Sequence, residues 1–360
     1  MFTMRMFPTY PGSRALVGSL GLMLLMGVWS CAPATGGQDR AKLSRLAMGI
    51  FGTLPSEAVS EMNLITEAKT ELGRRLYYDK RLSKNHDISC NSCHSLSDYG
   101  VDGEPTSKGH REQRGGRNAP TVYNAAFHIA QFWDGRARDV EEQAKGPILN
   151  PIEMAMPSEE AVVHTLKSIP GYAPLFRAAF PNHADPITYD HMAQAIGAFE
   201  RRLVTPSRFD TFQSGELDAL SDAEVEGLTL FISTGCISCH NRATLGGTTY
   251  QKVGVVQEYM TEDMGRFAIT GNELDRHVFK VPSLRNIVET APYFHDGQIK
   301  TLEEAVRLMG QHQLGWDLSE NDVKTIVAFL GSLTGTIDQE YIAMPELPPS
   351  GSETPAPNPN

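Results

Sequence analysis

Two copies of one cysteine and histidine pattern carry the clearest chemistry in this chain. The attachment residues are Cys90, Cys93 and His94 in the first copy, CNSCH, and Cys236, Cys239 and His240 in the second copy, CISCH. A C-x-x-C-H run is typical of covalent haem attachment, in which the thiols bond to the haem and the imidazole becomes an axial ligand. A redox dithiol does not need this histidine, and the cysteine pairs of a zinc site usually lie much closer together in sequence. The sequence therefore predicts two haem c groups.

The sixth ligand of the second haem is expected to be a methionine. A histidine–methionine pair raises the reduction potential of a haem and closes its iron to substrate, which suits electron transfer. The methionines after His240 are Met260, Met264, Met309 and Met344. Met309 ends a predicted helix 69 residues after His240, whereas Met344 adjoins the polar C-terminal segment. Met309 is therefore the expected ligand, with Met260 and Met264 as alternatives.

The sixth ligand of the first haem is expected to be a removable histidine. His110 follows His94 by 16 residues, in a loop over 98–118 that contains five glycines. Such a loop suits a ligand that must be released better than one that is permanent. His128 is the competing candidate.

An open haem that reacts with a small oxidant needs a proton-transferring group beside its iron. Glu153, in the mostly apolar sequence NPIEM, is the candidate general acid/base. Trp133 occupies the position that corresponds to His295 in an internal repeat, and its indole is a candidate stepping stone for an electron. A packed core tryptophan is the competing interpretation of Trp133.

The internal repeat relates the two halves of the chain. PTVYN at 120–124 recurs as PSLRN at 282–286, and FWDG at 132–135 recurs as FHDG at 294–297, each 162 residues later. Duplication of one haem domain is the simplest explanation of this constant offset. The domain boundary is expected in the polar stretch 204–218.

The elements that position these residues are expected to be helices. Apolar residues at helical spacing and Ser or Thr caps indicate where they begin and end. The predicted helices are 67–78, 158–166, 188–204, 221–232, 302–309 and 319–330. No alternating strand pattern is present. The predicted fold is mainly α, with two cytochrome c-like haem domains related by internal duplication and with long loops.

The two ends of the chain have different compositions. Residues 1–31 are typical of an export signal, with two arginines before an apolar run that is too short to span a membrane. Cys31 lies in a sequence that resembles a bacterial lipobox and is the expected lipidation site, with ordinary cleavage after Ala32 or Ala34 as the alternative. Residues 32–50 are expected to be a tether, and the polar residues 337–360 a disordered tail.

The net charge of −11 argues against a nucleic-acid partner and favours neutral or basic protein partners. Covalent haem attachment in bacteria normally follows export. We therefore expect the protein in the periplasm, anchored to a membrane by lipid if Cys31 is modified.

Over about residues 51–336 the chain resembles the bacterial dihaem cytochrome c peroxidases. The resemblance rests on CNSCH, SKGH, GRNAPTVYNAAF, QFWDGRARDVEEQAKGPI, NPIEM, CISCH, GRF, TAPYFHDG and LMG, in this order. It implies a peroxidatic haem domain over 51–204 and an electron-transfer cytochrome c domain over 205–336.

The resemblance also implies roles for single residues. His110 would be the sixth ligand of the peroxidatic haem in the fully oxidised enzyme and would leave when the other haem is reduced. Met309 would be the sixth ligand of that electron-transfer haem. Glu153 and Gln143 match the distal pocket of the family, and Trp133 matches the tryptophan between its haems.

A calcium ion between the domains is implied in the same way. Its ligands here would be the Asn118 side chain and the backbone carbonyls of Thr290 and Pro292, with water completing the shell. An oxygen-rich, partly hydrated shell suits calcium.

The predicted function is reduction of hydrogen peroxide to water with electrons from a small cytochrome c or cupredoxin, by an enzyme that is a homodimer in the family. One alternative is a dihaem oxidase of the methylamine-utilisation type, which acts on a protein and has a tyrosine in place of the methionine ligand. Another is a dihaem electron carrier without bond-making chemistry. Met309 disfavours the first, and Glu153 and Gln143 disfavour the second.

Overall fold

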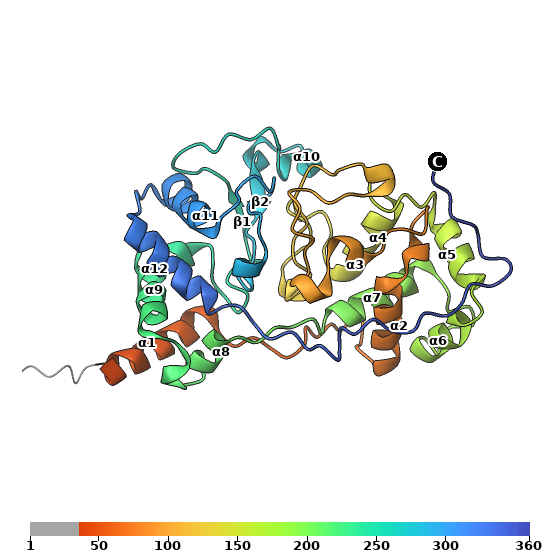
Figure 1. Cartoon of the computed structure of the whole chain (residues 1–360), viewed down its shortest axis with the longest axis horizontal. Helices are drawn as coiled ribbons and strands as arrows, with labels where there is room; N and C mark the ends of the chain where they lie inside the picture. Colours follow the sequence, from red (N-terminus) through yellow and green to blue (C-terminus); the bar gives the residue numbers. More distant parts are fainter. Residues whose placement is uncertain (1–35) are drawn as a thin grey trace, which may run out of the picture. The chain divides into compact units, whose positions relative to one another are not determined.

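The structure, a computed structural model, describes residues 36–360 and is mainly helical (Figure 1). Its helices are α1 Gly36–Phe51, α2 Glu67–Tyr78, α3 Cys90–Cys93, α4 Val140–Leu149, α5 Glu159–Lys167, α6 Tyr172–Ala179, α7 Tyr189–Glu200, α8 Arg208–Gln213, α9 Asp222–Ser233, α10 Phe267–Thr270, α11 Leu302–Met309 and α12 Glu320–Gly331. The expected signal segment 1–31, with Cys31, lies outside the described residues. None of the helices within 36–360 has the length and apolar character that a membrane span requires.

The helices α9, α11 and α12 begin at the side-chain caps that the sequence predicted. The Ser221 side chain accepts a hydrogen bond from the backbone of Glu224, and the Glu224 carboxylate accepts one from Ser221, as in a capping box. Ser319 caps α12 in the same manner, and Thr301 caps α11. The predicted helix over 188–204 is shorter than expected, because α7 ends at Glu200.

The sequence predicted no strands, but the structure contains one short strand pair. Two strands of three residues each, β1 Tyr250–Lys252 and β2 Val278–Lys280, pair antiparallel, with Tyr250 opposite Lys280. Strands this short are below the length at which an alternating pattern can be recognised in a sequence.

Two hydrophobic cores hold the described residues together. The first gathers side chains of α2, α5, α6 and α7, such as Leu72 and Phe199, and the second gathers those of α8, α9, α11 and α12, such as Phe329. The same two groups of helices are seen in Figure 1. Along the middle of the chain the first core ends at Leu203 and the second begins at Phe209.

Both ends of the described chain pack against the opposite half. Helix α1 buries Ala47 and Phe51 in the second core, with Leu43 and Ile50 packed at its edge. The expected tether over 32–50 is therefore wrong for its helical part. The apolar residues of α1 recur at a spacing of three and four, which places them on one face of the helix.

The predicted disorder of residues 337–360 is also wrong. Ile342 is buried in the first core, and the chain beyond it runs past α2 and α6 (Figure 1). Tyr341 donates to the Phe199 carbonyl at 2.8 Å, Arg81 donates to the Pro348 carbonyl at 2.9 Å, and other polar contacts continue to the end. This segment is held mainly by hydrogen bonds from folded residues, which its own composition does not indicate.

The positions that repeat in the sequence have matching backbones. Asn124 and Asn286 both have left-handed conformations, with φ of 60° and 62°, and Phe132 and Phe294 follow with 64° and 66°. Thr205 lies between the halves, and its hydroxyl accepts a hydrogen bond at 2.9 Å from the side-chain amide of each asparagine. The three polar side chains are buried, so a buried polar contact links the two halves here.

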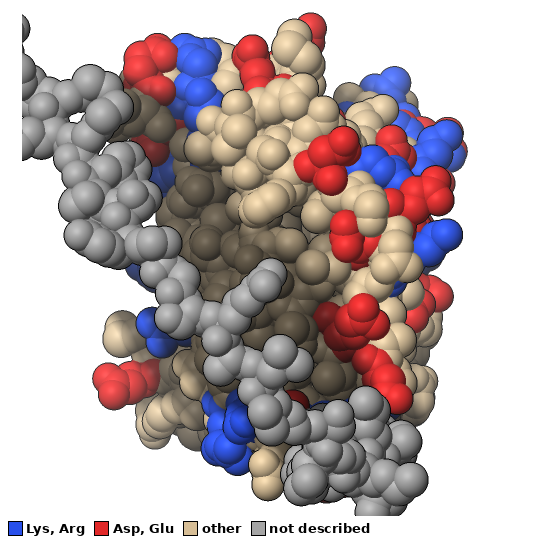
Figure 2. Space-filling view, turned by 90° about the vertical axis from the view of Figure 1, so that its left-hand side faces the viewer, with Lys and Arg blue, Asp and Glu red and all other residues tan. Residues whose placement is uncertain are grey.

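Charged side chains of both signs lie on the face that carries α1, α9 and α12. Figure 2 shows uncharged surface across the middle of this face, with Asp and Glu side chains along one side and smaller groups of Lys and Arg. Arg40 on α1 pairs with Asp222 at the start of α9, with 2.5 Å between Nη2 and Oδ1. Opposite charges therefore occur as neighbours here, despite the net charge of −11.

Candidate active site

The second C-x-x-C-H motif follows directly from helix α9. Gly235 turns the chain with φ of 92°, a left-handed conformation that favours glycine, and the turn Cys236–Ser238 follows. The His240 Nδ1 atom lies 3.1 Å from the Leu245 carbonyl oxygen. Because a carbonyl can only accept, Nδ1 carries the proton and the Nε2 lone pair remains for a metal.

A mostly apolar cavity opens beside this motif. Cys236, Cys239, His240 and Met309 all line it. Met309 reaches the cavity because it is the last residue of α11, whose N-terminus is fixed by the Thr301 cap. This wall of two thiols, one imidazole and one thioether fits a covalent haem with histidine and methionine ligands.

The alternative methionines lie elsewhere. Met260 is 84% exposed and Met344 is 68% exposed, while Met264 contacts Arg276 through its sulfur at 2.7 Å. None of the three lines the cavity. Their placement supports Met309 as the ligand.

The first motif forms the single turn α3 and is held by neighbouring backbone groups. The His94 Nδ1 atom lies 3.3 Å from the Gly100 carbonyl, and the Tyr77 hydroxyl donates to the His94 carbonyl at 2.8 Å. Burial, the largest effect on both rings, lowers the pKa of His94 and of His240. Both imidazoles are therefore neutral, as a metal ligand must be.

The four motif cysteines lie in environments that disfavour the thiolate. Burial raises the pKa of Cys90, Cys236 and Cys239, and it raises the pKa of Cys93 to about 11. A redox dithiol requires the opposite, a thiol with a lowered pKa. The arrangement therefore favours haem attachment over the dithiol alternative.

The loop that carries His110 packs closely on the loop that carries Glu153. A Cβ atom on Gly109 would lie 2.0 Å from the Ile152 carbonyl oxygen and 2.8 Å from the Glu153 Cα, so only glycine permits this approach. The backbone N–H of His110 donates to the Glu153 carbonyl at 2.7 Å, and the His110 side chain is buried. The structure thus brings the predicted removable ligand and the predicted acid/base together.

The residues that follow His110 are strained. Arg111 and Glu112 have φ of 59° and 57°, left-handed values that cost a residue with a side chain about 1 kcal/mol or more. Gln113 then closes the turn, because its side-chain amide donates to the His110 carbonyl at 3.0 Å. Two strained residues lower the stability of the closed loop, which suits a ligand that must leave.

Burial raises the pKa of Glu153 above its usual value. The Arg136 charge and a hydrogen bond from Asn150 Nδ2, at 2.9 Å from Oε1, act in the opposite direction without cancelling the effect of burial. The carboxyl also lies near enough to the first motif that its charge contributes, after burial, to the raised pKa of Cys93. A carboxyl with a raised pKa beside a haem-binding thiol is suited to general acid/base chemistry.

Gln143 lies on α4, and Glu153 lies in the turn that folds back on the end of this helix. Asp139 caps α4, and Met154 N–H donates to the Pro147 carbonyl at 3.1 Å. Both predicted distal residues therefore come from one short segment, although no hydrogen bond joins their side chains in the described part of the chain.

Trp133 faces the residue that occupies its own position in the second repeat. Its ring and that of His295 lie edge to face, with centroids 6.3 Å apart, and His295 stacks on Phe279 at 4.2 Å. Trp133 Nε1 donates to the Asn118 carbonyl at 3.0 Å. Trp133 also lines the cavity of the second motif, so it lies where an electron could pass between the halves.

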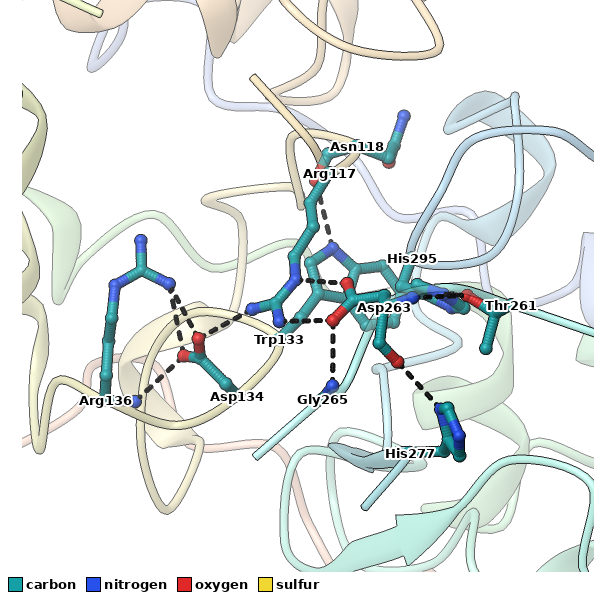
Figure 3. Close-up of polar contacts among 10 residues, drawn as sticks. All are labelled: Arg117, Asn118, Trp133, Asp134, Arg136, Thr261, Asp263, Gly265, His277 and His295. Carbon is teal, nitrogen blue, oxygen red and sulfur yellow. Dashed lines mark hydrogen bonds and ion pairs between the residues drawn. The ribbon is translucent and has the colours of Figure 1, made fainter. Parts of the chain in front are cut away.

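A cluster of ion pairs surrounds Trp133 (Figure 3). Arg117 binds Asp263 through two nitrogens, Nε at 2.6 Å and Nη2 at 2.8 Å, and it binds Asp134 through Nη1 at 2.6 Å. Arg136 adds a second cation to Asp134 at 3.1 Å. Arg117 and Asp134 belong to the first half and Asp263 to the second, so the cluster joins the two halves beside Trp133.

The three predicted calcium ligands lie on the wall of the same cavity. Asn118, Thr290 and Pro292 all line it, and the Asn118 Nδ2 atom donates to the Glu104 carbonyl at 3.1 Å. Within residues 36–360 no group of three or more His, Cys, Asp or Glu side chains is arranged to hold a metal ion. An ion here would have to rely on the amide and carbonyl oxygens that were predicted.

Sequence reasoning missed several residues at this site, notably Arg117, Asp263 and Lys280. Each has a partner more than 100 residues away in the sequence, since Arg117 pairs with Asp263 and Lys280 contacts His128. His128, the alternative to His110, lies beside Lys280 in the cavity of the second motif and not beside Glu153. Only the internal repeat pointed to a residue of this group in advance, because it aligned His295 with Trp133, and the two rings are in contact.

Comparison with known proteins gives consistent matches. Residues 67–218 match the family of di-haem cytochrome c peroxidases. The chain is 45% identical over 346 residues to the cytochrome c551 peroxidase of Pseudomonas aeruginosa, which covers 94% of this chain and 97% of that protein. It is 50% identical over 292 residues to the cytochrome c551 peroxidase of Nitrosomonas europaea, with coverage of 80% and 86%.

Relatives with another named role are more distant. The methylamine utilization protein MauG of Methylorubrum extorquens is 35% identical over 300 residues, with coverage of 79% of this chain and 83% of that protein. Among solved structures, a MauG-like protein associated with microbial copper homeostasis has a TM-score of 0.74 and 30% identity. It covers 81% of this chain, and 97% of its own length is matched.

Proposed function

We propose a role for individual residues in the reduction of hydrogen peroxide, because the chain belongs to the di-haem cytochrome c peroxidase family. It is an oxidoreductase with two haem c groups that takes electrons from a cytochrome and uses hydrogen peroxide as the acceptor. The bound haems supply iron that exchanges electrons and that, at one site, accepts peroxide as a ligand. Two electrons and two protons convert each peroxide to two waters.

We assign the peroxide site to the first motif. His94 would hold the haem at this motif, and His110 would be its second, removable ligand, carried on a loop that can open. Glu153 would take a proton from one peroxide oxygen and deliver it to the other, which would leave as water when the haems supply the electrons that break the O–O bond. Gln143 assists by orienting the peroxide.

One observation carries this assignment. Gly109 and His110 lie directly on Ile152 and Glu153, so the movement that frees the iron also exposes the carboxyl that the reaction needs. An electron carrier without bond-making chemistry would need neither the half-buried Glu153 carboxyl nor the strained loop. The cavity position of Met309 likewise supports a peroxidase over the methylamine-utilisation alternative, in which a tyrosine is expected.

We assign electron transfer to the second motif. His240 and Met309 would both ligate the iron of its haem, and this ligand pair would suit electron transfer and exclude peroxide. Trp133 and His295 lie edge to face between the two halves and are the proposed route for the electron. The donor is proposed to be a small cytochrome c, with a cupredoxin as the alternative.

Several further features rest on the sequence and the family. We propose that calcium binds Asn118, Thr290 and Pro292, that the enzyme is a periplasmic homodimer, and that Cys31 carries a lipid. Chelation followed by spectroscopy tests the calcium site, sedimentation tests the dimer, and mass spectrometry of the mature N-terminus tests Cys31.

Two substitutions test the peroxide site. Glu153→Gln should leave both haems attached and slow peroxide turnover by about 10²–10⁴, whereas Glu226→Gln on the exposed face of α9 should not. His110→Gly should give an enzyme that is active without prior reduction. Normal turnover by the Glu153 variant would remove Glu153 from the mechanism, and a His110 variant that still requires reduction would assign the gate to another residue.

A further inference from the structure

Lys280 is a buried cation without an anionic partner among residues 36–360. The residue ends strand β2 and is 6% exposed. Its Nζ atom has one hydrogen-bond partner in the described chain, the Nδ1 atom of His128 at 3.3 Å, and burial lowers the pKa of Lys280 to about 8. A charge in this position is costly unless a ligand of opposite charge joins it.

His128 is held rigidly against Lys280. A Cβ atom on Gly247, which has φ of 74°, would lie 2.1 Å from the His128 ring, so glycine is required here for both conformation and space. The neighbouring Ile129 N–H donates to the Gly247 carbonyl at 2.8 Å. The position of the imidazole is therefore fixed by backbone contacts from the other half of the chain.

The proton on the His128 ring can be placed. Burial and, after it, the Lys280 charge lower the pKa of His128 well below its usual value, so the ring is neutral. The ammonium can only donate, so Nδ1 accepts and Nε2 carries the proton. Nε2 is buried and has no hydrogen-bond partner within residues 36–360. The His128 Nε2–H and the remaining N–H groups of the Lys280 ammonium thus lack an acceptor among residues 36–360.

Both residues line the cavity that also contains Cys236, Cys239 and His240. Haem carries two carboxylate side chains, the propionates, and each is an anionic acceptor. We propose that Lys280 and His128 bind the propionates of the haem attached at CISCH. The inference rests on haem at this motif and is independent of the peroxide chemistry proposed at His94.

The bound cation affects the reduction potential of this haem. Reduction lowers the positive charge at the iron, so a nearby cation favours the reduced form and raises the potential. Lys280 also donates its backbone N–H to the Trp133 carbonyl at 2.7 Å, which links the propionate site to the proposed electron route. Lys280 is therefore a positioning residue that keeps the second haem easily reduced.

Potentiometry of the haem-loaded enzyme tests the proposal. Lys280→Met should lower the equilibrium constant for reduction of the second haem about tenfold, a fall in potential of about 59 mV. Lys280→Arg, which keeps the charge, should change the constant less than threefold. The control is Lys252→Met, since Lys252 lies exposed on β1 opposite Val278 in the same small sheet.

A crystal structure of the wild-type haem-loaded enzyme provides a second test that does not depend on a stable variant. Propionate oxygens are expected within hydrogen-bond distance of Lys280 Nζ and of His128 Nε2. Propionates that point elsewhere, or a Lys280→Met enzyme with both haems attached and an unchanged potential, would overturn the proposal. A wild-type enzyme with the expected propionate contacts but without peroxide turnover would instead count against the function assigned to the first motif.

Discussion

The contact between Gly109 and Ile152 offers a direct test of the proposed gate. Gly109→Ala adds one methyl group whose carbon would lie 2.0 Å from the Ile152 carbonyl oxygen. An ordinary contact is about 3.5 Å, so the two loops must move apart by about 1.5 Å. The Gly109 backbone has φ of −108°, which any residue adopts, so the effect comes from this contact and not from backbone strain.

The expected cost follows from the bond that this movement breaks. The hydrogen bond from His110 N–H to the Glu153 carbonyl is 2.7 Å long and would be lost. An unsatisfied buried donor costs about 1–3 kcal/mol, so the closed loop should lose about that amount relative to the open one. At about 1.4 kcal/mol for each factor of ten, the open population should rise roughly ten- to a hundredfold.

The assay is the spin state of the first haem in the fully oxidised enzyme, together with peroxide turnover without prior reduction. Gly109→Ala should increase the high-spin fraction and confer activity before reduction. Gly115→Ala is the matched control, because a Cβ atom there meets nothing within 4 Å in the same loop. A Gly109 variant that stays low-spin and inactive, or a Gly115 variant with the same effect, would refute the reasoning.

Two further substitutions probe the acid/base group and the junction. Arg136→Leu removes a charge that lowers the pKa of Glu153, so that pKa should rise further. Because the base must be deprotonated, the acidic limb of the kcat/KM profile should move to higher pH, whereas Arg138→Leu on the exposed surface should leave it in place. Thr205→Val removes the acceptor of two buried amides and should lower the free energy of unfolding in urea by about 2–6 kcal/mol, at about 1–3 kcal/mol for each amide. Thr229→Val, on an exposed turn of α9, should change it by less than about 0.5 kcal/mol.

The sequence predicted those parts of the site that depend on local chemistry. The C-x-x-C-H motifs fix their own haem ligands, and the caps at Ser221 and Thr301 fix where α9 and α11 begin, which in turn places Met309 at the cavity. These features involve residues within a few positions of one another. A single sequence can therefore indicate them.

The features that were missed depend on distant parts of the chain. The tether prediction for 32–50 ignored an apolar face that becomes meaningful only when a second core is present to receive it. The tail prediction failed because Arg81 and other side chains of the first half supply the hydrogen bonds. Lys280 and His128 are separated by 152 positions, and the lack of an anion beside them cannot be recognised before both are placed.

The anchoring of the gating loop limits how far it must move. The far end of the loop is fixed to the other half, since Asn118 N–H donates to the His295 carbonyl at 2.8 Å and Arg117 binds Asp263 through two nitrogens. Glu104 and Arg114 pair at 2.8 Å within the loop. The proposed release of His110 would therefore break contacts around Gly109, and the ion pairs beside Trp133 could stay intact. The proposed electron route and the proposed gate can thus operate in one fold without separation of the two halves.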